Sequence, residues 1–319
     1  MPQDSERKKI TASIDLGPNY IYHILAVCRI NFDSPYADKY ADSVKPADVE
    51  TMRNAAKMIT FGGGQGGELI DFIVVPMSAG LGTRDEFREY YDQLDHAIGS
   101  GEYEPFIKRY GMDAEHFEPW FAMEHGDLKN AEKHRATLQE YGRVFTDNFD
   151  RYAETIWPSM KTEMEPVKTD IEAHFADTDV IEQWEAQTRI TFKRDSFHPV
   201  LCSAIANGPN ANSFAYDRVV FYHHTPRPKL LDLIVHEVGT HILIEPFKAM
   251  WMPDSPHRQD LYHAYECLAS FMARRILGRS LNFDMPSYRQ EHFDARITEL
   301  LEANPKVPVA ELLRELVEK

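Results

Sequence analysis

The most informative stretch of this 319-residue sequence is KLLDLIVHEVGTHILI, residues 229–244. Before it, residues 225–228 read Thr-Pro-Arg-Pro, in which the threonine can cap a helix and a proline can occupy its first turn. After it comes Glu245-Pro246, and the residue that precedes a proline disfavours helical geometry. These signals predict a strongly apolar helix over about residues 229–244. Three polar, chemically versatile side chains lie inside it: His236, Glu237 and His241.

The spacing of the two histidines points to zinc and predicts an irregular helix. Catalytic zinc takes three protein ligands and leaves a fourth position for water, and a glutamate beside the first histidine can act there as general base. The usual interval between the histidines is four residues, whereas His236 and His241 are five apart. Five residues turn an α-helix by about 500°, which leaves the two rings about 140° apart. A π-bulge would bring them together, and glycine tolerates such backbone, so we expect a bulge around Gly239. The other interpretation is a pair of hydrogen-bonded core histidines.

A third zinc ligand is expected on the next helix, which starts near Ser255-Pro256 and ends at Gly278. Glu266 lies there among small and apolar residues, where an unpaired carboxylate would be costly. His263, one turn earlier on the same face, is the alternative ligand. Glu245 is a weaker candidate, because a helix end before proline is usually solvated.

The segments His236-Glu237-Val238-Gly239-Thr240-His241 and Glu266-Cys267-Leu268-Ala269 together resemble gluzincin metallopeptidases with a lengthened His-Glu-x-x-x-His motif. Two branches are similar: dipeptidyl peptidase III, and the tubulin tyrosine carboxypeptidase family with its bacterial relatives. The resemblance covers only about residues 229–275. It implies that His236, His241 and Glu266 are zinc ligands and that Glu237 is the base.

The segment before the helix, residues 213–224, has strand-like content centred on residues 218–222. In peptidases of this kind an edge strand pairs with an extended substrate. Tyr222 and His224 are therefore candidates to stabilise the oxyanion that forms when a carbonyl is attacked. Further candidates for that role are Tyr216, His223, Tyr262 and Tyr265.

The overall pattern predicts an α+β fold that is mostly α. Residues 1–187 are expected to form a mainly helical region, and residues 188–319 a zincin-like catalytic unit with a small mixed sheet. Strand-like content also occurs at residues 9–15, 189–192 and 200–206. The strand at 9–15 is a candidate to join the later sheet.

Composition limits the partners and the compartment. The chain has a net charge of −16, which argues against a nucleic-acid partner because an acidic surface repels phosphates. No apolar run is long enough to span a bilayer, so no membrane association is expected. The three cysteines form no CxxC pair and fit a reducing compartment, so a cytoplasmic location is predicted. The oligomeric state does not follow from the sequence.

These observations favour a Zn²⁺-dependent metallopeptidase that hydrolyses peptide bonds of a peptide or protein substrate. Zinc would activate water and Glu237 would accept its proton. One alternative is a non-catalytic metal-binding or interaction protein with a structural or decayed site. A second alternative is a metal-dependent hydrolase of an amide that is not a peptide.

Overall fold

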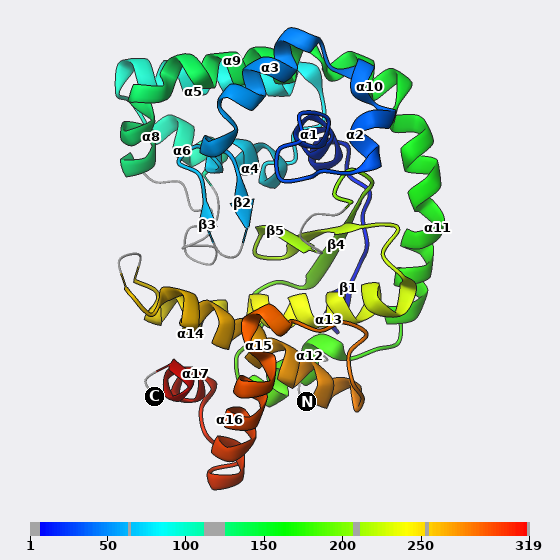
Figure 1. Cartoon of the computed structure of the whole chain (residues 1–319), viewed down its shortest axis with the longest axis vertical. Helices are drawn as coiled ribbons and strands as arrows, with labels where there is room; N and C mark the ends of the chain where they lie inside the picture. The colour runs from blue at the N-terminus through cyan, green and yellow to red at the C-terminus, as the bar shows by residue number, and fades with distance from the viewer. Residues whose placement is uncertain (1–6, 63–64, 112–124, 207–210, 253–254, 318–319) are drawn as a thin grey trace, which may run out of the picture. The chain divides into compact units, whose positions relative to one another are not determined.

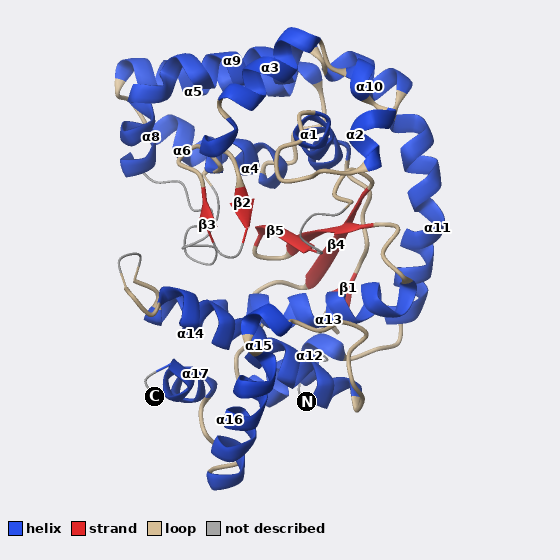
Figure 2. Cartoon of the chain, viewed as in Figure 1, coloured by secondary structure: helices blue, strands red, loops and turns tan. Residues whose placement is uncertain are grey.

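The computed structural model describes residues 7–62, 65–111, 125–206, 211–252 and 255–317. Within these residues the chain is mostly helical and carries a small mixed sheet, as Figure 2 shows. The predicted α+β, mostly α class is therefore confirmed.

The chain divides into two compact units, and neither is one continuous stretch. The α13 unit consists of Met1–Thr11, Ile171–Pro199 and Thr225–Lys319, and the α1 unit consists of Ala12–Asp170 and Val200–His224. The boundary expected at residue 187 falls inside helix α12 (Val180–Thr188), which belongs to the α13 unit.

The α1 unit is built around helix α1 (Leu16–Val27), which is buried from Gly17 to Val27. Tyr20 on this helix donates its hydroxyl hydrogen to the carbonyl oxygen of Phe145 at 2.6 Å and packs edge-on against Phe87. In Figure 1, helices α5 and α9 lie side by side within this unit. Its remaining elements are α2 (Pro35–Lys39), η1 (Ala41–Ser43), α3 (Pro46–Asn54), η2 (Ala56–Met58), β2 (Phe61–Gly62), β3 (Gln65–Gly66), α4 (Asp71–Ser78), α5 (Arg84–Ser100), α6 (Glu104–Tyr110), α8 (His125–Ala131), η3 (Glu132–His134), α9 (Arg135–Asp147), α10 (Phe149–Thr155), β5 (Ala211–Ala215) and β6 (Arg218–Tyr222).

The α13 unit is a helical cluster in which α13 (Arg227–Ile242) packs against α12 and α15 (Arg258–Leu277). Helix α15 ends at Gly278, whose φ of 64° is the left-handed conformation that favours glycine. The other elements of the unit are β1 (Lys9–Ile10), α14 (Ile244–Met250), η4 (Pro286–Tyr288), α16 (Gln290–Ala303) and α17 (Val309–Val317). Helix α11 (Trp157–Phe175) and strand β4 (Ser196–Cys202) each contribute residues to both units.

The described strands form a four-stranded sheet in the order β1-β4-β6-β5, and β2 pairs with β3 separately. Strand β1 runs parallel to β4, with Ile10 opposite Phe197; of the strand expected at 9–15, only Lys9–Ile10 form a strand in the sheet, and Ser13 makes an isolated bridge to Val200. The segment 213–224, expected as one strand, instead contributes to an antiparallel hairpin of β5 and β6.

The strand expected at residues 189–192 does not form. The backbone N–H of Phe192 donates to the Glu185 carboxylate at 2.7 Å, and that of Ile190 donates to the Thr188 hydroxyl at 3.3 Å. These side chains satisfy the backbone locally, and such bonds compete with a sheet ladder. The strand begins only at Ser196.

Among the helices in the described part of the chain, none combines the length and the apolar character needed to cross a bilayer.

Candidate active site

Helix α13 places the predicted site residues in the interior of its unit. It starts at Arg227, two residues after Thr225, has Pro228 in its first turn and is buried along most of its length; Pro226, not Thr225, holds the N-cap position. It ends at Ile242, and α14 begins two residues later with Pro246 in its first turn, where proline is tolerated. His236 and His241 are both buried, with 2% and 4% of their surface exposed.

The structure brings His236 of α13 and Glu266 of α15 together. The Nε2 atom of His236 lies 3.1 Å from Oε2 of Glu266, although 30 positions separate the two residues. The side chain of His236 is 3% exposed and that of Glu266 is 14% exposed, so the pair is largely shielded from solvent. The sequence predicted this proximity, and the role of the two residues as zinc ligands stays a prediction.

Ser270 holds the other nitrogen of the His236 ring. Its hydroxyl lies 3.2 Å from Nδ1 of His236, and the ring of Phe283 packs edge-on at 5.5 Å. Ser270 lies four residues after Glu266, so both project from the same face of α15. Sequence reasoning missed Ser270, although this spacing was a usable signal. A hydrogen bond at one ring nitrogen fixes the imidazole so that the other can meet a metal or a proton.

Glu237 is the second carboxyl group at this centre. The hydroxyl of Thr240 donates to its Oε2 atom at 3.0 Å. Burial raises the pKa of Glu237 to about 7; the charge of His236 opposes this shift and that of Glu266 adds to it. Burial alone would lower the pKa of His236, but the hydrogen bond to Glu266 and the charges of both glutamates leave it raised. Glu237 can therefore exchange a proton near neutral pH.

The predicted bulge around Gly239 is wrong. Helix α13 is α-helical through Ile242, and the N–H of Leu243 donates to the carbonyl of Gly239 at 2.9 Å in the ordinary α-helical pattern. Close packing explains why residue 239 is glycine, because a Cβ atom at this position would lie 2.1 Å from Cζ2 of Trp184. The Nε1–H of Trp184 donates to the carbonyl of Val235 at 2.9 Å, so the glycine allows the indole to lie directly against α13.

Because α13 is regular, His241 faces other neighbours than His236 does. Its ring packs edge-on against Phe197 of β4, with ring centroids 5.4 Å apart. Among the described residues, His236, His241 and Glu266 do not form a group whose donor atoms all lie within 4.8 Å of one another. The structure thus assembles two of the three predicted ligands, and the place of His241 in a metal site stays a prediction.

The alternative ligands have different partners. The Nε2 atom of His263 lies 2.8 Å from Nε2 of Gln259, and the His263 ring stacks on the ring of Tyr288. Glu245 forms an ion pair with Lys193 at 3.3 Å, which agrees with its interpretation as a solvated helix end.

Two tyrosines of α15 support the centre in different ways. Tyr265 donates its hydroxyl hydrogen to the carbonyl of Thr240 at 2.6 Å, which ties the last turn of α13 to α15. Tyr262 hydrogen-bonds Glu266 and Tyr288, and burial together with the Glu266 charge raises its pKa well above the usual value. Tyr262 therefore stays protonated at neutral pH and donates its hydroxyl hydrogen to the Glu266 carboxylate.

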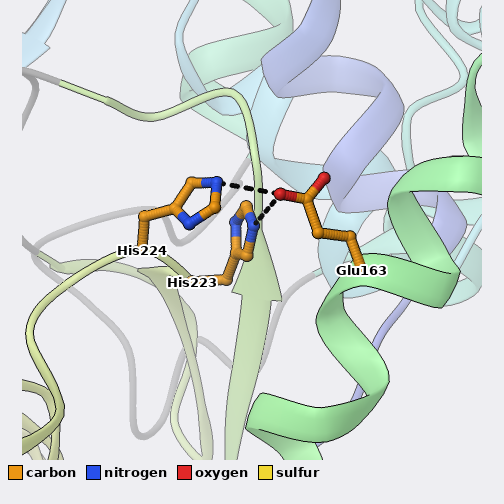
Figure 3. A group of neighbouring side chains, drawn as sticks. All are labelled: Glu163, His223 and His224. Carbon is orange, nitrogen blue, oxygen red and sulfur yellow. Dashed lines mark ion pairs between the residues drawn. The ribbon is translucent and has the colours of Figure 1, made fainter.

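The remaining candidates, Tyr222 and His224, belong to the α1 unit. There His224 meets Glu163 and His223 in a cluster that sequence reasoning did not identify, shown in Figure 3. The His223-His224 pair was visible in the sequence, but Glu163 lies about 60 positions earlier and no spacing rule connects it to the pair. Tyr216 is also in this unit and is 3% exposed.

Comparison with protein-family models, with curated proteins and with solved structures gave no significant match. The resemblance to gluzincin peptidases over residues 229–275 consequently rests on the residues that carry it.

Proposed function

We propose that this protein is a zinc-dependent hydrolase, and specifically a metallopeptidase, whose centre is His236, Glu237 and Glu266. The observation that supports it most is the 3.1 Å approach of His236 Nε2 to Glu266 Oε2, with Ser270 at the opposite ring nitrogen. A buried histidine with one nitrogen held by a hydroxyl and the other facing a carboxylate has the arrangement of a metal ligand.

The donor set fits zinc in part. Two ligands of one tetrahedral zinc, at usual bond lengths, lie about 3.4 Å apart. The 3.1 Å between His236 Nε2 and Glu266 Oε2 is close to that value, and imidazole and carboxylate are donors that zinc accepts. His241 is the third donor in the proposal, although in this structure it packs on Phe197. When bound, zinc would supply Lewis-acid activation of water and of the scissile carbonyl.

Side chains of the protein would supply the proton transfer, the stabilisation of the oxyanion and the orientation of His236. Glu237, with a pKa of about 7, accepts a proton during attack on the carbonyl and returns it to the leaving amine. Tyr262 stays protonated, and its hydroxyl hydrogen, which is donated to Glu266 in this structure, would turn to the oxygen that gains negative charge. Ser270 keeps the His236 ring oriented.

Metal analysis of the purified full chain tests the proposal directly. We expect zinc at this centre to be lost in His236→Ala and in Glu266→Gln. His263→Ala is the matched control on α15, because His263 pairs with Gln259 and Tyr288 instead, and it should keep its zinc. His241→Ala decides whether the third donor is His241. Unchanged zinc content in both His236→Ala and Glu266→Gln would refute the proposal.

Activity and substrate class are tested with Glu237→Gln. We expect this variant to keep zinc and to lose cleavage of a peptide library by at least about 100-fold, the lower range for a general base. Ser270→Ala should weaken zinc binding by about 10- to 100-fold, as expected for a residue that orients a ligand. Turnover of simple amides without cleavage of any peptide would favour the non-peptide hydrolase instead.

The regular geometry of α13 favours a second candidate, a non-catalytic metal-binding or interaction protein. Among the described residues, His236, His241 and Glu266 do not bring their donor atoms within 4.8 Å of one another, whereas His236 and Glu266 contact each other directly. In that case the wild-type chain cleaves no peptide, and Glu237→Gln has no activity to remove.

A further inference from the structure

A second group of potential metal ligands lies in the α1 unit, in Glu163, His223 and His224. One donor atom from each residue lies within 4.8 Å of the other two. Oε1 of Glu163 is 3.5 Å from Nε2 of His223 and 3.0 Å from Nε2 of His224. Figure 3 shows both imidazole rings pointing toward the Glu163 carboxylate.

The end of strand β6 explains why two consecutive histidines face the same way. Side chains of neighbouring residues in a strand point to opposite faces, but β6 ends at Tyr222 and the chain turns there. The rings of His223 and His224 consequently lie together, with centroids 3.7 Å apart. Tyr222 packs edge-on against both rings, and helix α11 supplies Glu163.

His223 is the buried member of the cluster. Its side chain is 2% exposed, and its Nδ1 atom lies 3.3 Å from the carbonyl oxygen of Cys202. A carbonyl only accepts, so Nδ1 carries the hydrogen and the neutral ring has its lone pair on Nε2. Among the described residues, Nε2 of His223 makes no hydrogen bond of ordinary geometry, and its contact with Oε1 of Glu163 is at 3.5 Å. The structure thus contains a buried nitrogen lone pair that is aimed at Glu163 and His224.

Protonated histidines do not account well for this arrangement. The two imidazole rings lie with their centroids 3.7 Å apart, and a single carboxylate faces both of them. Two imidazolium rings at this separation would repel each other. Neutral imidazoles beside a carboxylate form a donor set that suits a transition metal, whereas calcium and magnesium prefer oxygen ligands.

We propose that Glu163, His223 and His224 bind a divalent transition-metal ion, with Zn²⁺ as the best fit. Ligand atoms of a tetrahedral zinc lie about 3.4 Å apart, and the distances of 3.0 and 3.5 Å from Glu163 lie on either side of that value. Three protein ligands leave one coordination position for water or another small ligand. Because the side chains of Glu163 and His224 are 51% and 55% exposed, solvent reaches that position. The site is independent of the centre at His236.

Zinc titration of the metal-free full chain, in competition with a chromophoric chelator, tests the site. The variants are Glu163→Gln and His224→Ala, whose exposed side chains can change without disturbing the core. We expect each variant to bind zinc at this site at least about tenfold more weakly than the wild type does. The matched controls are Glu165→Gln, exposed on the same helix, and His96→Ala, exposed on α5; both should bind as the wild type does.

Cobalt substitution provides a second measurement. Co²⁺ bound here should give visible absorption bands of nitrogen and oxygen ligation that Glu163→Gln and His224→Ala abolish. His236→Ala should leave the bands of this site in place, which separates the two metal proposals. Unchanged zinc stoichiometry and affinity in both Glu163→Gln and His224→Ala, with folding verified by circular dichroism, would overturn the assignment.

Discussion

Gly239→Ala is the substitution whose outcome follows most directly from the packing of α13. In a helix this change usually stabilises, by about 1 kcal/mol, because alanine is the better helix former. Here the added methyl carbon would lie 2.1 Å from Cζ2 and 2.2 Å from Cη2 of Trp184. The indole is fully buried and its Nε1–H donates to Val235, so it has little freedom to move away.

The magnitude comes from three contributions. Overpacking a buried site costs typically 1–3 kcal/mol, of which about 2 kcal/mol is a central value. Displacing the indole also loses its hydrogen bond to Val235, worth about 1 kcal/mol. The gain of about 1 kcal/mol in helix propensity offsets part of this. We therefore expect the free energy of unfolding of Gly239→Ala to fall by about 2 kcal/mol.

Urea denaturation followed by circular dichroism measures this change. Gly126→Ala is the matched control, since Gly126 lies in helix α8 and a Cβ there meets no atom within 4 Å. That variant should be neutral or gain up to about 1 kcal/mol. In a Trp184→Leu background the clash is removed, so Gly239→Ala should no longer destabilise. If Gly239→Ala is as stable as the wild type, or if Trp184→Leu leaves its effect unchanged, the packing argument is refuted.

Three further predictions concern charge and thiol chemistry. Burial raises the pKa of Glu237 to about 7, so the contribution of this carboxyl group to stability falls as the pH rises from about 4.5 through 7. The metal-free Glu237→Gln variant should therefore gain about 3 kcal/mol in free energy of unfolding, relative to the wild type, between pH 4.5 and 8. Urea denaturation at the two pH values measures this gain. Arg279→Ala removes the half-exposed guanidinium that lies 2.9 Å from the buried Asp232 carboxylate, and it should cost about 2 kcal/mol at pH 7. Burial alone would raise the pKa of Asp232, but Arg279 and Asn282 hold it below its ordinary value, so thermal melting should show the loss shrinking as the pH falls below about 4. Burial raises the pKa of the thiols of Cys28, Cys202 and Cys267 to about 12. A colorimetric thiol reagent should therefore react slowly with the native chain and rapidly with all three cysteines after unfolding.

The sequence predicted the parts of the site that depend on local pattern and on the cost of burying charge. The apolar run with a proline in its first turn located α13 closely. A carboxylate among small residues on the following helix indicated a buried partner, and Glu266 indeed meets His236. Both inferences needed only helix periodicity and the need of buried polar groups for partners.

The features that the sequence did not predict depend on contacts between distant segments. Gly239 indicated irregular backbone, but the same residue also permits close packing, and only the position of Trp184 distinguishes the two. The cluster of Glu163 with His223 and His224 joins a helix to the end of a strand, and no local rule gives that pairing. No strand forms at residues 189–192, because the backbone N–H of Phe192 donates to the Glu185 carboxylate, and strand propensity does not take such a contact into account.

The order in which the two units alternate along the chain affects how the protein is synthesised and how its gene can be divided. The five segments alternate between the units, so there are four junctions, after residues 11, 170, 199 and 224. During synthesis α12 is complete well before α13 and α15, the helices it packs against, have been translated. Its buried face, which includes Trp184, therefore waits for the last third of the chain. For the same reason, replacing one unit by recombination would require four coordinated crossovers.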